Sequence, residues 1–327
     1  MNCLGSKTHI NPYSFYEPHL DVNEKFPPIE IFEFSDPGLR ADPTKPHLLT
    51  SSVTKRHLSP CIGTELKGVQ ISQLGKEGLD ELALFVAERK LVIFRDQDFK
   101  DIGPERQIEI ARHFGPIQCH PTSANVKGYP EFHLVFRKTD LSDQANRTSW
   151  HTDVTYERQP PGTTFLFILR QPSLGGDTLF ASQVEAYNRL SPEFQKRLQG
   201  LTAVHSGAVQ ADNAKRCGRP IRREAIETEH PLVRQHPVTG EKALFVNHGY
   251  TKRIVGFKPE ESECLLKFLF DHISKGADFH VRATYEPGTV VVWDNRVTVH
   301  SATRDFPLDE DRLAVRLTPQ AEIPIPA

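Results

Sequence analysis

Short apolar segments of strand length recur along the chain from about residue 90, and this recurrence constrains the fold more than any other feature. Each segment is rich in branched aliphatic or aromatic residues and is bounded by polar or turn-forming residues, which is typical of β-strands. These segments are residues 91–97, 132–138, 163–170, 201–206, 243–247, 280–285, 289–293 and 312–318. A chain with this many short strands predicts a β-rich domain.

Helical periodicity is limited to three segments, which are residues 76–90, 104–115 and 259–273. In the first, Leu79, Leu82 and Val86 recur at the spacing of one helix face. Because the helices are few and lie early and late, the order favours an α+β or mainly β domain over a doubly wound α/β domain. The sequence contains no G-x-G-x-x-G and no Walker A motif, so the usual nucleotide cradles are absent.

The 327 residues suit one domain that carries an N-terminal extension. Residues 1–60 contain eight of the 25 prolines and predict an irregular segment that wraps over a domain formed by residues 61–327. The polar segment 207–225 interrupts the strand pattern and predicts a lid insertion. Its concentrated Lys and Arg residues indicate a solvated surface, recruitment of an anionic substrate or, as a third interpretation, nucleic-acid binding.

Composition excludes several classes of function. The formal net charge of −2 provides no overall attraction to nucleic acid or to an anionic membrane, so we expect neither partner. The five cysteines are far apart and form no C-x-x-C pair, which argues against a disulfide framework and a zinc–thiolate site. No apolar run reaches the roughly 20 residues that span a bilayer. We therefore expect a cytoplasmic protein.

The segment W-H-T-D-V-T-Y, residues 150–156, holds the first candidate metal ligands. His151 and Asp153 are two residues apart, so in an extended chain their side chains lie on the same face. One imidazole and one carboxylate, completed by a second histidine, form the facial triad of non-heme iron(II) oxygenases. The H-x-D pattern by itself is short enough to occur by chance among 15 histidines.

The segment W-D-N-R-V-T-V-H, residues 293–300, follows an apolar strand and supplies His300 as the second histidine. A surface turn with a structural histidine is the alternative. In the strand-like segment 312–318, Arg312 and Arg316 lie on one face. Two guanidinium groups on one face indicate either two bound anions or an exposed strand with outward charges.

With these segments in order, the sequence resembles the taurine dioxygenase family, which includes alkylsulfatase and herbicide-degrading dioxygenases. The resemblance extends from about Cys61 to Thr318 and includes G-G-D-T-L-F at 175–180 and F-V-N-x-G-Y-T-x-R-I-V at 245–255. The Pro-rich opening resembles that of fungal sulfonate dioxygenase-like members. The resemblance implies a double-stranded β-helix, that is, a cupin-like jelly roll with flanking helices.

The resemblance also implies an enzyme that uses iron(II), 2-oxoglutarate and dioxygen and forms succinate and carbon dioxide. His151, Asp153 and His300 would bind the iron, and Thr178 and Arg312 would bind the distal carboxylate of 2-oxoglutarate. The primary substrate would be a small anion, and the residues implied for its pocket are Arg316, His120, Tyr250 and Val154.

The substrate is less constrained than the cofactors. A sulfonate or an alkyl sulfate fits the resemblance, but Ser123 and Arg147 stand where the taurine enzyme has a tyrosine and an asparagine. An amino acid or other small carboxylic acid that is hydroxylated, desaturated or cyclised in natural-product biosynthesis is the alternative. A non-catalytic jelly roll and a zinc hydrolase are further alternatives, although the ligand set suits iron better. By analogy with the family, we expect a homodimer or homotetramer.

Overall fold

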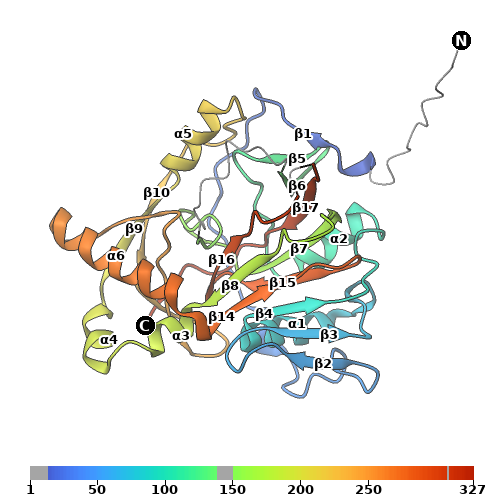
Figure 1. Ribbon diagram of the computed structural model, residues 1–327, viewed down its shortest axis with the longest axis horizontal. Helices are drawn as coiled ribbons and strands as arrows, with labels where there is room; N and C mark the ends of the chain where they lie inside the picture. The colour runs from blue at the N-terminus through green and yellow to red at the C-terminus, as the bar shows by residue number, and fades with distance from the viewer. Residues whose placement is uncertain (1–13, 138–149, 308) are drawn as a thin grey trace, which may run out of the picture.

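The computed structural model describes residues 14–137, 150–307 and 309–327, and within them the largest sheet has nine strands (Figure 1). Its neighbouring strands are antiparallel except for the parallel pair β3–β4. In spatial order they are β1 (Pro18–His19), β5 (Ala124–Val126), β6 (Tyr129–Arg137), β17 (Arg312–Leu317), β7 (Thr163–Arg170), β15 (Val290–Asp294), β4 (Leu91–Phe94), β3 (Thr64–Lys67) and β2 (Thr54–His57). The C-terminal strands β17 and β15 therefore flank β7 in its centre, and the N-terminal strands β1 and β2 form its two edges.

Three smaller sheets account for the remaining strands of the described residues. The first contains β14 (His280–Ala283), β8 (Thr178–Ser182) and β16 (Thr298–Ala302). The second contains β10 (Glu227–Pro231), β9 (Thr202–Ser206) and β13 (Thr251–Ile254). The third contains β12 (Lys242–Leu244), β11 (Val233–Gln235) and β18 (Ile325–Pro326).

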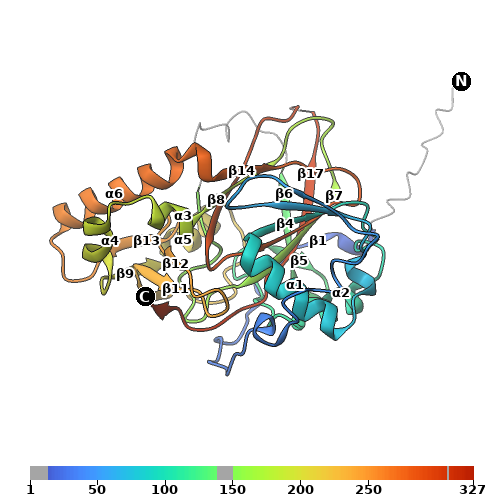
Figure 2. The ribbon, with the colours of Figure 1, turned by 90° about the horizontal axis from the view of Figure 1, so that it is seen from below.

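The large sheet buries a different core on each face because its side chains alternate. Leu313 and Val315 of β17 belong to the cluster that includes α1 (Lys76–Arg89) and α2 (Pro104–Arg112), which cover one face (Figure 2). Ala314 points the other way, into a cluster with Phe180 of β8 and Trp293 of β15. The β14–β8–β16 sheet thus packs on the second face of the large sheet. The candidate metal ligands lie between these two layers.

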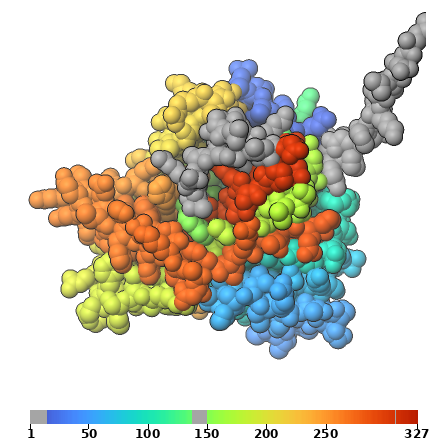
Figure 3. Space-filling model, viewed as in Figure 1, coloured from blue at the N-terminus to red at the C-terminus, as the bar shows by residue number. Residues whose placement is uncertain are grey.

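The remaining helices lie mostly at the other end of the molecule. They are α3 (Gln183–Asn188), α4 (Pro192–Leu198), α5 (Ala208–Arg216) and α6 (Pro259–Lys275). In the space-filling view α6 forms a ridge that projects from the body (Figure 3). Within the described residues, no helix is long and apolar enough to cross a membrane.

The N-terminal segment is mostly irregular but is attached to the domain by buried contacts. Asp36, in this segment, forms an ion pair with Arg296, and both side chains are almost fully buried. Further upstream, Glu24 forms an ion pair with Arg222, whose carbonyl accepts a hydrogen bond from the backbone N–H of Phe26. Because a buried charge must be paired to be tolerated, these contacts fix the path of the segment.

The mainly β architecture with flanking helices is confirmed, and so are the three predicted helices, with ends shifted by up to three residues. Regular structure begins before the expected residue 61, because β1 lies at Pro18–His19 and β2 starts at Thr54. The short helices α3, α4 and α5 were not predicted. Local signals exist for two of them: Ser182 and Ser191 each accept a hydrogen bond from a backbone N–H in the first turn.

Candidate functional site

The structure brings the three predicted metal ligands together. The Nε2 atoms of His151 and His300 lie 3.7 Å and 3.6 Å from Oδ1 of Asp153. All three candidate ligand atoms lie within 4.8 Å of one another, and this is the only such group of His, Cys, Asp or Glu side chains in the described residues. The spacing leaves room for one cation between the three atoms.

Backbone pairing places the two histidines side by side. His151 forms an isolated antiparallel bridge with His300 in the middle of β16, in which each N–H donates to the other residue's carbonyl, at 3.0 Å and 2.8 Å. In such a pair the two side chains leave the same face. Their ring centroids are accordingly 4.3 Å apart. Residues 149 positions apart in the sequence thereby become neighbouring ligands.

Asp153 is held by one group on each carboxylate oxygen. Asn295 Nδ2 donates to Oδ2 at 3.2 Å, and Arg316 Nη1 donates to Oδ1 at 2.6 Å. Burial by itself raises the pKa of Asp153, but Arg316, His300 and His151 together hold that pKa below its usual value. Asp153 is therefore an anion whose orientation is fixed before any cation is bound.

The donor set fits an iron(II) ion. Burial, and next the adjacent His151, lower the pKa of His300 to about 3, so its imidazole is neutral, as a metal ligand must be. Two imidazoles and one carboxylate are the ligands of the facial triad, which leaves coordination positions free for other groups. Zinc sites more often use three or four Cys and His ligands, although zinc sites with two imidazoles and one carboxylate also exist.

Arg312 fits the carboxylate of a bound 2-oxo acid. Its side chain is buried on β17, and its Nε donates to the carbonyl of Gly176 at 2.7 Å. Its Nη2 is buried and has no hydrogen-bond partner among the described residues. A buried guanidinium nitrogen without a partner is costly, so the geometry suits an incoming anion. Tyr285 connects Arg312 to Thr178. The Thr178 hydroxyl is 2.8 Å from the Tyr285 hydroxyl, and the Arg312 guanidinium group lies over the Tyr285 ring.

Arg316 lies next to the metal cluster. Besides its bond to Asp153, its Nη2 donates to His133 Nδ1 at 2.7 Å, while its buried Nε has no partner among the described residues. Arg312 and Arg316 share one face of β17, as the strand pattern predicts. The interpretation of the pair as an exposed strand with outward charges is wrong, because both side chains are buried.

The residues expected in the substrate pocket form a chain of contacts from one metal ligand to another. The ring of Tyr250 lies 6.5 Å from that of His151, and its hydroxyl accepts a hydrogen bond from Gln210 at 2.9 Å. The ring of His120 lies 4.2 Å from that of His133, which contacts Arg316. Polar groups from widely separated segments therefore come together beside the metal cluster.

Val154, which directly follows the ligand Asp153, has an unusual backbone. It is buried and has φ of +36°, in the left-handed region that β-branched residues rarely adopt. Such a conformation costs about 1–3 kcal/mol and persists only where the surroundings impose it. Its backbone forms a hydrogen bond with Tyr250. The strained turn therefore connects a metal ligand to the pocket.

Four residues at the site were not predicted: Asn295, Tyr285, His133 and Gln210. Asn295 lies within the W-D-N-R segment, and Tyr285 lies at the end of a predicted strand, so both were close to recognised patterns. His133 lies within a predicted strand and Gln210 within the polar insertion, and neither has a motif. Arg147 lies outside the described residues.

Histidines without a motif are structural. His205 Nδ1 is 2.8 Å from the Thr155 hydroxyl, and His230 Nε2 is 3.0 Å from the Glu157 carbonyl. His236 forms a buried pair with Asp294. Each of these rings therefore has a partner within the protein, and none of them belongs to the metal cluster.

These buried histidines predict that the fold loses stability in acid. Burial lowers the pKa of His205 well below 6.5 and that of His230 to about 4. Below pH 6.5 the unfolded chain therefore binds more protons, so stability falls by up to ~1.4 kcal/mol per pH unit for each histidine. We expect a lower unfolding midpoint at pH 5.5 than at pH 7.5. His205→Gln should reduce this difference and exposed His248→Gln should not; identical differences in all three proteins would contradict the assignment.

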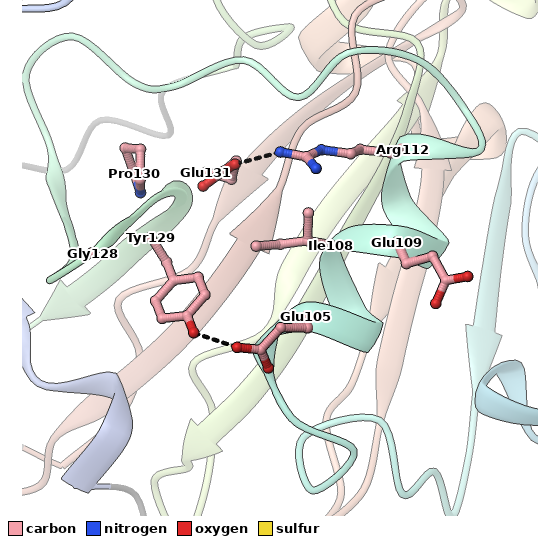
Figure 4. Close-up of a pocket in the computed structure, with 8 residues that line it drawn as sticks. All are labelled: Glu105, Ile108, Glu109, Arg112, Gly128, Tyr129, Pro130 and Glu131. Carbon is pink, nitrogen blue, oxygen red and sulfur yellow. Dashed lines mark hydrogen bonds and ion pairs between the residues drawn. The ribbon is translucent and has the colours of Figure 1, made fainter.

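Two surface clefts lie away from the metal cluster. One, of about 470 Å³, lies between α2 and β6, where Tyr129 bonds to Glu105 and Arg112 to Glu131 (Figure 4). The other, of about 650 Å³, lies between β13 and α6. In the first cleft each charged group already has a partner, since Glu109 also pairs with Arg106, so the cleft presents no group that needs a ligand.

Comparisons with known proteins agree with this geometry. Residues 54–318 match the family described as "Taurine catabolism dioxygenase TauD, TfdA family". An alpha-ketoglutarate-dependent dioxygenase, cnsP, of Penicillium expansum is 50% identical over 96% of this chain and 88% of its own length. An alpha-ketoglutarate-dependent sulfonate dioxygenase of Saccharomyces cerevisiae is 42% identical over 96% of this chain and 79% of its own length.

The structural comparison gives the same result. The crystal structure of a taurine dioxygenase from Burkholderia xenovorans superimposes with a TM-score of 0.69 and 33% identity, covering 84% of this chain and 93% of that one. This likeness confirms the jelly-roll fold that the sequence resemblance implied. The family match covers most of the chain and includes every residue of the cluster described above. The chain therefore belongs to the taurine catabolism dioxygenase TauD, TfdA family.

Proposed function

We propose that this chain is an iron(II)- and 2-oxoglutarate-dependent dioxygenase that oxidises a small anionic substrate, a sulfonate or an alkyl sulfate, and forms succinate and carbon dioxide. One observation carries the proposal. A His–Asp–His cluster, in which Asp153 and His300 are buried, lies beside two buried arginines, and each arginine keeps one nitrogen without a partner among the described residues. A cation and two anions would complete this arrangement.

Each group has a separate role in the proposal. His151, Asp153 and His300 hold iron(II), and Asn295 keeps the carboxylate of Asp153 in position. Thr178 and Arg312 bind the distal carboxylate of 2-oxoglutarate. The primary substrate is bound by residues that line the space beside the cluster, which are Arg316, His120, Tyr250 and Val154.

Bound iron(II), 2-oxoglutarate and dioxygen would supply the oxidising power, since oxidative decarboxylation of the 2-oxo acid is coupled to oxidation of a substrate C–H bond. The protein supplies position and exclusion of water. Phe180 and Trp293 place their rings 5.6 Å and 5.2 Å from that of His300 and shield it from solvent. Arg316 lies against Asp153 and so would place the anionic end of a substrate close to the metal.

The sulfonate class is supported by the yeast relative, whose name specifies a sulfonate, and by the charge of the pocket. Arg316 is buried there, while burial lowers the pKa of His120 to about 3 and keeps that ring neutral. Among the described residues, the only carboxylate that pairs with this guanidinium group is that of Asp153, which a bound metal ion would neutralise. A substrate anion is therefore the charge that balances the occupied site.

An amino acid or another small carboxylic acid is the second candidate substrate class. The Penicillium relative is more similar than the yeast relative, at 50% against 42% identity, and its name specifies no substrate. A carboxylate can pair with a guanidinium group as well as a sulfonate can. The reaction would then be hydroxylation, desaturation or cyclisation of that acid.

A substrate panel separates the two classes. Purified protein is supplied with iron(II), ascorbate and 2-oxoglutarate, and succinate is measured with sulfonates, alkyl sulfates, amino acids and carboxylic acids. The proposal predicts stimulation by a sulfur compound, together with release of sulfite or sulfate. If only an amino or carboxylic acid stimulated succinate formation, the iron-dependent reaction would stand, and the substrate would belong to the second class.

Four further predictions accompany the proposal. We expect a homodimer or homotetramer, which light scattering on the purified protein would test, and a cytoplasmic location, which fractionation would test. The division into an extension at 1–60 and a domain at 61–327 can be tested by limited proteolysis. The segment 207–225, which contains α5, is proposed to be a lid.

A further inference from the structure

Helix α5 places one polar side chain against Tyr250 and His120, which are expected to bind the primary substrate. Gln210 lies in its first turn, and the Gln210 side chain contacts three groups from three other segments. Its Oε1 accepts a hydrogen bond from the Tyr156 hydroxyl at 2.7 Å, and its Nε2 donates to the Tyr250 hydroxyl at 2.9 Å. Its Nε2 also lies 3.5 Å from Nε2 of His120.

In the contact between Gln210 and His120, both Nε2 atoms are hydrogen-bond donors. His120 Nδ1 accepts hydrogen bonds from the backbone N–H groups of Thr122 and Ser123, at 3.2 Å and 3.1 Å. Because the ring is neutral, its one proton must then be on Nε2. The amide of Gln210 has a second N–H besides the one given to Tyr250. Two N–H groups therefore face each other with no acceptor between them, which is unfavourable until an acceptor arrives.

The amide of Gln210 is oriented with its oxygen toward Tyr156, whose hydroxyl donates to Oε1. Burial raises the pKa of the Tyr156 hydroxyl well above its usual value, so the proton of this hydrogen bond is retained. The amide nitrogen is thereby turned toward Tyr250 and His120. In a reversed amide, Oε1 would accept the Nε2–H of His120, and no N–H group of this pair would remain for a ligand. The two orientations therefore predict different effects of Gln210 on ligand binding.

We propose that Gln210 is a substrate-specificity residue, whose Nε2–H and the Nε2–H of His120 together bind one oxygen of the anionic head group of the primary substrate. This inference rests on the proposed function and adds a contact from α5, outside the motifs of the domain core. Arg316 then supplies the positive charge, while the two neutral donors fix where the head group lies. The segment predicted as a lid would thus take part directly in substrate recognition.

The test measures anion binding to oxygen-free protein loaded with iron(II) and 2-oxoglutarate, by calorimetry, with ethanesulfonate and inorganic sulfate as probes. Gln210→Met keeps the length of the side chain without the donor and should weaken binding by about 10- to 100-fold, the usual range for a hydrogen bond to a charged group. Gln210→Glu keeps the acceptor for Tyr156 but adds a negative charge, and should weaken binding further than Gln210→Met does.

Val209→Ala is the matched control, because Val209 is adjacent on α5 and exposed. It should bind the probes as the unchanged protein does, and the unfolding midpoint of each variant shows whether it is folded. Equal binding by Gln210→Met and the unchanged protein would overturn the inference. So would an unchanged protein that binds neither probe; the proposed function would survive that result if another compound of the panel still stimulated succinate formation.

Discussion

Replacing Asp153 with alanine should abolish succinate formation and iron binding. Loss of groups that merely support metal ligands typically costs ~10–100-fold in affinity or activity, so loss of a ligand should cost more than that. Asp153 also carries the only carboxylate that the structure places against Arg316 among the described residues. Its removal would leave a buried guanidinium group beside the two histidines without the only carboxylate of the cluster, an environment that repels a cation. The measurements are metal content after loading with iron(II) and succinate formed per minute.

The matched controls separate loss of the ligand from loss of the fold. His151→Ala should have the same effect as Asp153→Ala, because each variant removes one of three ligands. His230→Gln removes a histidine that is more deeply buried than His151 and bonds to the backbone of Glu157 and Thr155, so this variant should keep its iron. Full activity in either ligand variant, with normal folding, would contradict the assignment of the site.

The second large effect is expected from the two arginines of β17. Arg312→Ala should raise the KM for 2-oxoglutarate, because Arg312 lies beside Thr178 and Tyr285 and keeps a free buried nitrogen there. Arg316→Ala should instead raise the KM for the primary substrate. Removing one partner of a charge-assisted pair costs about 1.5–3 kcal/mol, so each loss should be at least ~10-fold. Both constants are measured for both variants.

Lysine variants test the geometry of the two sites. Arg312→Lys keeps the charge but loses the planar fork that matches a carboxylate, so it should recover only part of the affinity for 2-oxoglutarate. Arg253→Ala, at an exposed position on β13, controls for the loss of a positive charge elsewhere. If Arg316→Ala raised the KM for 2-oxoglutarate and the KM for the primary substrate equally, the proposed assignment of one ligand to each arginine would be wrong.

Strand alternation made part of the site predictable. In β17, residues 312–317, hydrophobic side chains on one face pack against the helices, and this fixes both arginines on the other face. His151 and Asp153 also lie together, as expected, but on an isolated bridge followed by a turn and not on a strand. His300 could be assigned to the same site only from several separated motifs. No local pattern shows that residues as far apart as His151 and His300 form a backbone bridge.

The remaining parts of the site depend on tertiary contacts without a local signal. Gln210 is 90 residues from His120 and 54 from Tyr156, and only the packing of α5 over the core brings them together. His133 was within a predicted strand, but the face it uses is set by pairing with β17. The helices α3 to α5 are short, and short helices depend on packing more than on their own sequence.

Release of carbon dioxide from 2-oxoglutarate labelled at its C1 carboxylate tests the central claim most directly. The assay uses the panel compound that raises succinate formation most, with iron(II) or dioxygen present or withheld. The account predicts one carbon dioxide per succinate, release only when both iron(II) and dioxygen are supplied, and none from Asp153→Ala. Release that continued without iron(II), or at an undiminished rate in Asp153→Ala, would contradict it.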